Sequence, residues 1–274
     1  MATLAGTFSS RDRRPDLLSG TVRAHAIDRW IFVFMATWFI AIVLVGFIPD
    51  AVMKVQMVQA GQRPPFPGIL HVHAVLMGSF LLLLLAQTVM MATGHSTLHK
   101  QGGILGMVLA AALVAVGVAL APTMYYQTWN ALQTVPASAR APLQELLSLK
   151  ENILLLQLVA GVLFGVFITM ALLARSANSG FHKRMIFLAT AIPLAASIDR
   201  MSWLPNTFPA SPMGTDGYIV LAVAPLFLWD VIRNKRVHEA YMVWAAIFLP
   251  TSLLMNHLWD SPGWHASARH IMGV

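Results

Sequence analysis

Apolar residues gather in seven long runs along this 274-residue chain, and short polar stretches separate them. The runs cover residues 30–48, 69–93, 103–121, 153–174, 185–203, 218–232 and 242–258. Most are long enough to cross about 30 Å of hydrocarbon as one helix. Because unpaired backbone groups are costly in lipid, we predict an all-α fold: a polytopic membrane helix bundle with seven transmembrane helices.

The polar stretches define the domain organisation. We predict a polar cytoplasmic tail over residues 1–29, a membrane domain over 30–258 and a short periplasmic tail over 259–274. Of the 18 Lys and Arg residues, 12 fall in segments on the side of the N-terminus, which places that side in the cytoplasm and the C-terminus outside. No cleavable signal peptide is expected, since residues 1–29 hold no apolar core. The amphipathic stretch 141–152 is expected to lie along the membrane surface.

A weak internal repeat relates two halves of the bundle. A shift of 83 positions brings Leu-His-Lys at 98–100 onto Phe-His-Lys at 181–183, and Gly78 onto Gly161. The repeat indicates two related helical hairpins. It makes His99 and His182 equivalent positions.

Composition narrows the class of protein. The chain is 57% hydrophobic and 11% charged, whereas soluble domains carry about 25% charged residues. The lipid bilayer is therefore the main partner, and we expect a multi-pass protein of the bacterial inner (cytoplasmic) membrane. The residues behind the net charge of +7 are distributed as expected for the two sides of a membrane, so no nucleic-acid partner is expected. Cysteine is absent, which excludes disulfides, thiolate zinc, iron–sulfur clusters and cysteine-linked haem.

Ten histidines divide evenly between the two predicted membrane sides. The inner set is His25, His95, His99, His182 and His238, and the outer set is His71, His73, His257, His265 and His270. Four of the inner histidines stand just before an apolar run, which is typical of rings at headgroup level. The alternative for the inner set is haem ligation, with His99 and His182 as the pair.

The outer set predicts a polar pocket where the second, fifth and seventh runs converge. His71 and His73 are two positions apart, so on a helix they point about 200° from each other. The stripe through His73 also contains Gln87, which makes His73 the better candidate ligand. Its expected partners lie at similar depth: Asp199, Arg200, Asn256, His257, Asp260 and Glu151. The alternative is that Asp199 forms a salt bridge in the bundle and Arg200 reaches the surface.

Two mechanisms would use this outer pocket. In the first, His73 and His257 ligate a b-type haem and Arg200 pairs with a propionate. In the second, His73, His257 and Asp199, with His71 beside them, hold zinc or another divalent metal that activates water. Asp199 and Arg200 are then the candidate catalytic residues.

Two segments resemble known proteins. The Leu98-His99-Lys100 turn and its following glycines resemble a group of uncharacterised bacterial multi-span membrane proteins, whose helix pairs are joined by a Leu-His-Arg/Lys-x-x-Gly turn. The stretch FHKRMIFLATAIPLAASIDR at 181–200 is similar to a second signature of that group. More distantly, the arrangement is similar to cytochrome b561, which implies haem ligation by bundle histidines. Here, however, the histidines sit at the ends of the runs.

The sequence thus favours an integral membrane redox or electron-transfer protein with a b-type haem, and a quinone or a larger membrane complex as its partner. One alternative is a divalent-metal membrane enzyme with a His/Asp site at the outer face. Another is a cofactor-free accessory subunit of a larger complex. An oligomer is compatible with all three.

Overall fold

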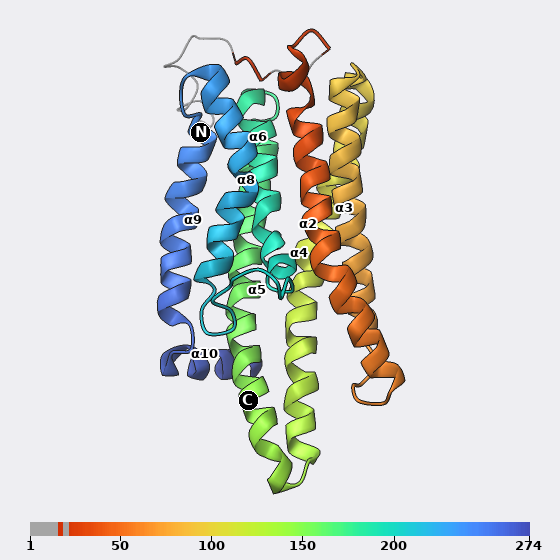
Figure 1. The fold of residues 1–274 in the computed structure, drawn as a ribbon, viewed down its shortest axis with the longest axis vertical. Coiled ribbons are helices and arrows are strands. Elements are labelled where there is room, and N and C mark those ends of the chain that lie inside the picture. The colour runs from red at the N-terminus through yellow and green to blue at the C-terminus, as the bar shows by residue number, and fades with distance from the viewer. Residues whose placement is uncertain (1–15, 19–21) are drawn as a thin grey trace.

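The computed structural model describes residues 16–18 and 22–274, and every regular element in this part is helical. The predicted tail over residues 1–29 falls largely outside the described residues. The elements are α2 (Ala26–Gln59), α3 (Gly68–Ala92), α4 (Ser96–Thr134), η1 (Ala137–Ala139), α5 (Arg140–Ala174), α6 (Ser179–Ala191), η2 (Ile192–Leu194), α7 (Ala195–Ile198), α8 (Met213–Asn234), α9 (Glu239–Leu258) and α10 (Pro262–Met272). The long helices run side by side along the long axis of the molecule (Figure 1).

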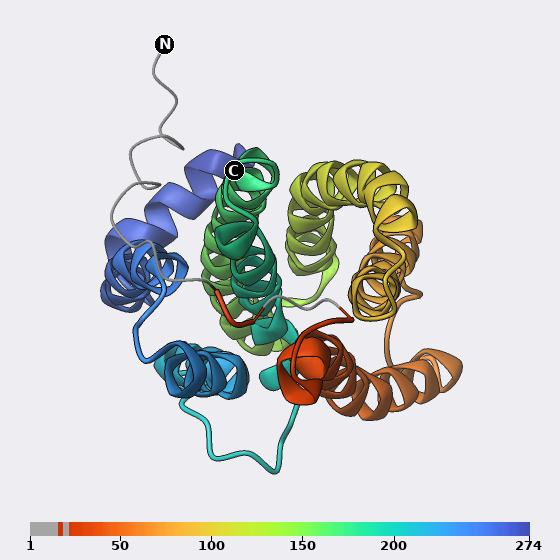
Figure 2. The ribbon, with the colours of Figure 1, turned by 90° about the horizontal axis from the view of Figure 1, so that it is seen from above.

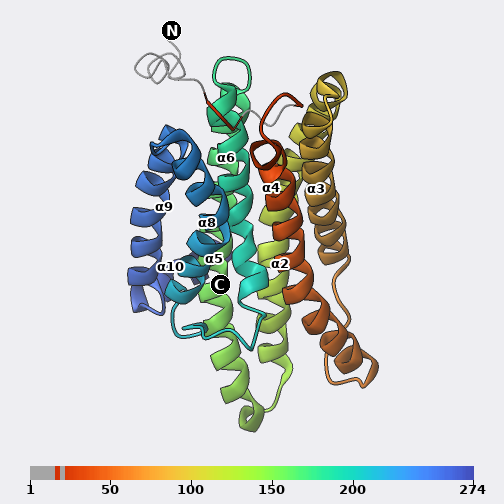
Figure 3. The same cartoon turned by 45° about the horizontal axis from the view of Figure 1, so that its top comes forward.

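Six of these helices, α2, α3, α4, α5, α8 and α9, are long and apolar enough to cross a membrane. The fifth predicted run forms three pieces instead, namely α6, η2 and α7. Pro193 stands in the η2 turn, and a proline lacks the N–H that a continuous helix needs. The loop between α7 and α8 therefore lies part-way along the bundle (Figures 1 and 3). The length and apolar composition of these six helices indicate a multi-pass membrane protein.

Helices α5 and α6 occupy the centre, with α3 and α4 on one side and α8 and α9 on the other (Figure 2). The core between them is apolar and closely packed: Met35, Phe39, Phe167, Met185 and Leu188 are almost fully buried. The outward faces carry exposed aliphatic side chains such as Val75, Leu82 and Leu173. These faces suit contact with lipid chains.

One prediction at the ends of the runs is wrong. The stretch 141–152 does not lie along a surface, because it continues directly into α5 and buries Leu147, Glu151 and Asn152. Residues of the predicted C-terminal tail form α10, which packs across α5 (Figure 1). Trp264, Ala268 and Met272 share one buried face of α10, which explains the docking.

Candidate functional site

We call the end of the bundle where α4, α6 and α9 begin the His99 end, and the opposite end the α10 end. His99 and His182 lie at the His99 end, each as the fourth residue of its helix. The Nδ1 atom of His99 is 3.3 Å from the carbonyl oxygen of Gln87 on α3. The Nδ1 atom of His182 is 2.8 Å from the carbonyl oxygen of Ala171 on α5. The two turns thus hold their histidines in the same way.

This contact fixes the tautomer of both neutral rings. A carbonyl oxygen only accepts hydrogen bonds, so in the neutral ring Nδ1 carries the proton and Nε2 keeps its lone pair. No described residue donates to either Nε2 atom. Histidines that bind metals characteristically have the second ring nitrogen held by such a carbonyl. The two imidazoles are also close enough for the charge of one to act on the other.

The surroundings of His99 contain a buried acceptor with no partner. The side-chain Oε1 of Gln87 makes no hydrogen bond to any described residue. The amide of Gln87 packs against Gly102, where an added Cβ would come within 2.9 Å of its Nε2 atom. Lys100 and Arg175 bring positive charge close to the two rings. The site therefore combines two fixed imidazoles, an unpaired amide oxygen and two cations.

A second polar centre at this end surrounds Arg184, which has no exposed surface. Its guanidinium donates to both carboxylate oxygens of Asp230, with an Nη2–Oδ1 distance of 2.8 Å. It also donates to both oxygens of Asp16, each at 2.9 Å. Sequence reasoning missed this centre. A lone acid inside the sixth apolar run, Asp230, was the signal that could have found it.

Asp16 ties the chain before α2 to this centre. Lys183 pairs with Asp16 at 2.7 Å and also donates to the carbonyl oxygen of Leu18, which is fully buried. Burial alone would raise the pKa of Asp16, but the hydrogen bonds and charges of Arg184 and Lys183 outweigh it and hold that pKa below its usual range. The Asp16 carboxylate is therefore ionised at physiological pH.

The structure does not bring His73 and His257 together. His73 is half-buried on α3, and its Nδ1 atom has no partner among the described residues. His257 is exposed on α9, and α3 and α9 lie on opposite sides of the bundle (Figures 1 and 2). His71 is exposed and meets the Phe66 ring edge-on. A single cofactor held by His73 and His257, as expected from the sequence, does not fit this arrangement.

Asp199 and Arg200 have separate partners. Asp199 accepts hydrogen bonds from Thr215 and Asn206. Arg200 donates to Asp50 at 3.1 Å and lies over the Phe47 ring. Neither residue contacts a histidine, so a metal site formed by Asp199 with His71, His73 and His257 is not assembled.

Glu151 is fully buried and holds α10 in place. It accepts from Arg269 at 2.8 Å and pairs with His265 at 2.6 Å, and its backbone carbonyl accepts from the Trp264 indole. His265 also contacts Asp260 at 3.0 Å, and Asp260 in turn contacts Asn152. These polar residues thus serve docking of α10, and they do not face His73.

Nowhere in residues 16–18 and 22–274 do three or more His, Asp or Glu side chains gather so that they could hold a metal ion. The strongest candidate in this part of the chain is therefore the His99–His182 pair, which needs only two protein ligands. Comparison with other proteins adds no assignment: no known protein family matches the sequence, and no curated protein or solved structure is significantly similar to it.

Proposed function

We propose that the protein carries electrons in a bacterial inner membrane on a b-type haem, with His99 and His182 as its two axial ligands. The observation that carries this proposal is the matched environment of the two imidazoles, each with Nδ1–H donated to a carbonyl of the preceding helix. Because the chain contains no cysteine, the haem would be held without a thioether bond.

The donor set suits such a group. A bound haem supplies reversible one-electron exchange at its iron. The carbonyls of Gln87 and Ala171 orient the imidazoles and make each Nε2 a stronger donor. Lys100 and Arg175 provide positive charge that suits anionic propionates, and the free amide oxygen of Gln87 provides an acceptor.

The orientation belongs to the same proposal. We infer seven crossings, with α6, η2 and α7 together forming the fifth, and the His99 end in the cytoplasm. The support for this orientation is the excess of Lys and Arg in segments at that end. Electrons would then enter or leave the haem near the cytoplasmic surface.

The test is the visible spectrum of the purified protein. We expect a Soret band that shifts on reduction, and we expect His99→Ala and His182→Ala each to abolish it. His95→Ala is the matched control, because His95 lies in the same turn but is exposed, and among the described side chains its ring contacts only the Thr93 hydroxyl, at 2.9 Å. His73→Ala should also keep the pigment. A colourless wild-type protein from haem-supplied cells, or a pigment that survives both substitutions, would contradict the proposal.

A further inference from the structure

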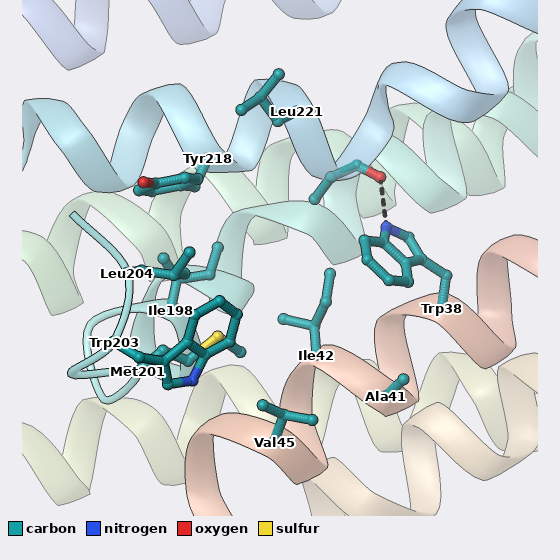
Figure 4. A pocket seen from close by; sticks show the side chains of 11 residues that line it. Trp38, Ala41, Ile42, Val45, Ile198, Met201, Trp203, Leu204, Tyr218 and Leu221 are labelled. Atoms are coloured by element: carbon teal, nitrogen blue, oxygen red, sulfur yellow. Dashed lines mark hydrogen bonds between the residues drawn. The ribbon is translucent and has the colours of Figure 1, made fainter. Parts of the chain in front are cut away.

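Two faces of α2 meet different surroundings. One face, with Trp38, Ile42 and Val45, lines an apolar pocket of about 280 Å³ between α2 and α8 (Figure 4). The Trp38 indole there already donates to the Ala222 carbonyl oxygen, at 3.2 Å, and no charged side chain lines the pocket. Phe47 comes two positions after Val45, so it points about 200° away from it. The opposite face of α2 therefore leads to other neighbours.

Those neighbours are charged and centre on Asp50. Its Oδ2 atom accepts from Lys54 Nζ at 2.6 Å and from Arg200 Nε at 3.1 Å. The guanidinium carbon of Arg200 also lies 4.5 Å from the centroid of the Phe47 ring, so the turn that follows α7 is held against this face of α2. All three charged side chains are partly buried. One carboxylate thus serves two cations.

Two further cations join this group without bringing a carboxylate. Arg63, in the loop between α2 and α3, lies over the Phe66 ring at 5.4 Å, and Lys150 is partly buried on α5. The charges of Arg63, Lys54 and Arg200 all act on Lys150, so the four cations share one neighbourhood. Neither Arg63 nor Lys150 pairs with a carboxylate in the described part of the chain. We call Lys54, Arg63, Lys150 and Arg200 the cation cluster.

The cation cluster is short of negative charge. Its four cations share the single carboxylate of Asp50, which leaves a formal surplus of three positive charges. Partial burial reduces screening by water, so such a surplus is costly unless an anion offsets it. The Arg184 centre at the other end shows the contrast, because its two cations, Arg184 and Lys183, meet two carboxylates. The surplus therefore points to an anion that the described residues do not supply.

We propose that the cation cluster binds a phosphate group, carried either by an anionic phospholipid or by a soluble phosphate. The guanidinium groups present forks of donors that match phosphate oxygens, and the lysines add point charges. Donors remain for this purpose: Arg200 uses Nε on Asp50 and Nη1 on the Ala196 carbonyl, so its Nη2 donates to no described residue. A phosphate suits the cluster better than chloride, because several oxygens can reach cations that come from four segments of the chain.

The depth of the cation cluster admits both sources of phosphate. The apolar run in α2 ends at residue 48 and the run in α5 begins at residue 153. Lys54 and Lys150 therefore lie just beyond the hydrocarbon layer, at the level of lipid headgroups. A lipid phosphate would enter from the membrane side, and a soluble phosphate from the water side. Neither route depends on the proposed haem function.

The experiment is calorimetric titration of the delipidated, purified full-length protein with two probes, inorganic phosphate and dihexanoyl phosphatidylglycerol. We expect binding, and the probe that binds more tightly identifies the source of the phosphate. Lys150→Gln and Arg63→Gln each remove one charged donor, so we expect each to weaken binding by about 10-fold. Lys150→Arg keeps the charge and should keep most of the affinity. Melting temperatures verify that the variants are folded, and Arg63 lies in a loop, where the exchange disturbs no helix.

Arg140→Gln is the matched control, because it removes the same charge from an exposed residue of α5. Arg140 lies ten residues before Lys150, about 15 Å away along the helix axis, and its exchange should leave the affinity unchanged. Three outcomes would overturn the assignment: neither probe binds the wild-type protein, both glutamine variants of the cluster bind as well as the wild type, or Arg140→Gln weakens binding as much as Lys150→Gln does.

Discussion

Gly180 allows three charged or titratable groups to converge at the His99 end. A Cβ at this position would lie 3.1 Å from both Asp16 Oδ2 and His238 Nε2, and 3.4 Å from Arg184 Nη1. These three groups occupy the space that a side chain at position 180 would otherwise take. Arg184 and Lys183 together balance the carboxylates of Asp16 and Asp230, so the ring of His238 meets a centre without net negative charge.

His238 is therefore expected to make stability depend on pH. Its Nδ1 accepts the Ala240 N–H at 3.1 Å, which requires a neutral ring, and burial together with the charge of Arg184 lowers its pKa from 6.5 to about 4. Between these values the unfolded chain binds more protons than the folded one, so stability is complete above pH 6.5 and falls as the pH drops towards 4.

The measurement is the melting temperature at pH 7.5 and pH 5. We expect the wild-type protein to lose a few degrees more than His238→Asn, which keeps a capping side chain but does not titrate. Asp16 does not affect the comparison between pH 7.5 and pH 5, because the stability that it contributes is lost only below its ordinary pKa of 3.8. Identical pH profiles for the two proteins would exclude this role of His238.

The elements show what hydropathy can and cannot define. Six apolar runs correspond to single helices, because an apolar stretch of that length has no other way to satisfy its backbone in lipid. Hydropathy does not report where a helix ends outside the apolar run. Helix α2 continues beyond its run to Gln59, and α5 begins before its run, at Arg140. The break at Pro193 depended on one residue inside the fifth run.

The packing of α7 gives a prediction for a single methyl group. Gly46 on α2 touches the backbone of Ser197, and an added Cβ would overlap the Ser197 carbonyl oxygen. Backbone cannot move aside as a flexible side chain can, so Gly46→Ala should destabilise the protein by about 1–3 kcal/mol. Gly78→Ala is the control, since nothing lies within 4 Å of its new Cβ. Thermal unfolding in detergent should separate the two, and equal melting temperatures would show that α7 yields.

At the scale of the molecule, the order of helices around the bundle is what the sequence left open. The repeat placed His99 and His182 in equivalent turns, and their matching carbonyl contacts agree with it. The outer pocket depended instead on α3 lying beside α9, and no periodic pattern within either helix says which neighbour it will have. Arg184 was missed for a related reason: its partners are 46 and 168 residues away in the chain.

The inferred topology can be tested by labelling single cysteines in intact cells, since the chain provides no thiol background. Ser96 at the His99 end and Ser267 on α10 are both exposed. A membrane-impermeant maleimide should label Ser267→Cys and Gln62→Cys from outside and should reach Ser96→Cys only after the cells are opened. If Ser96→Cys and Ser267→Cys were both labelled from the same side, the chain would cross the membrane an even number of times between these two residues. The inferred topology would then be wrong.

The hairpin of α4 and α5 projects past the α10 end of the bundle (Figure 1). At 39 residues, α4 is about 58 Å long, nearly twice the thickness of the hydrocarbon layer. The tip of this hairpin, at residues 135–139, is consequently a suitable epitope outside the detergent belt. An antibody fragment bound there would add a fiducial mass for electron microscopy while leaving the lipid-facing surfaces and both histidine turns untouched.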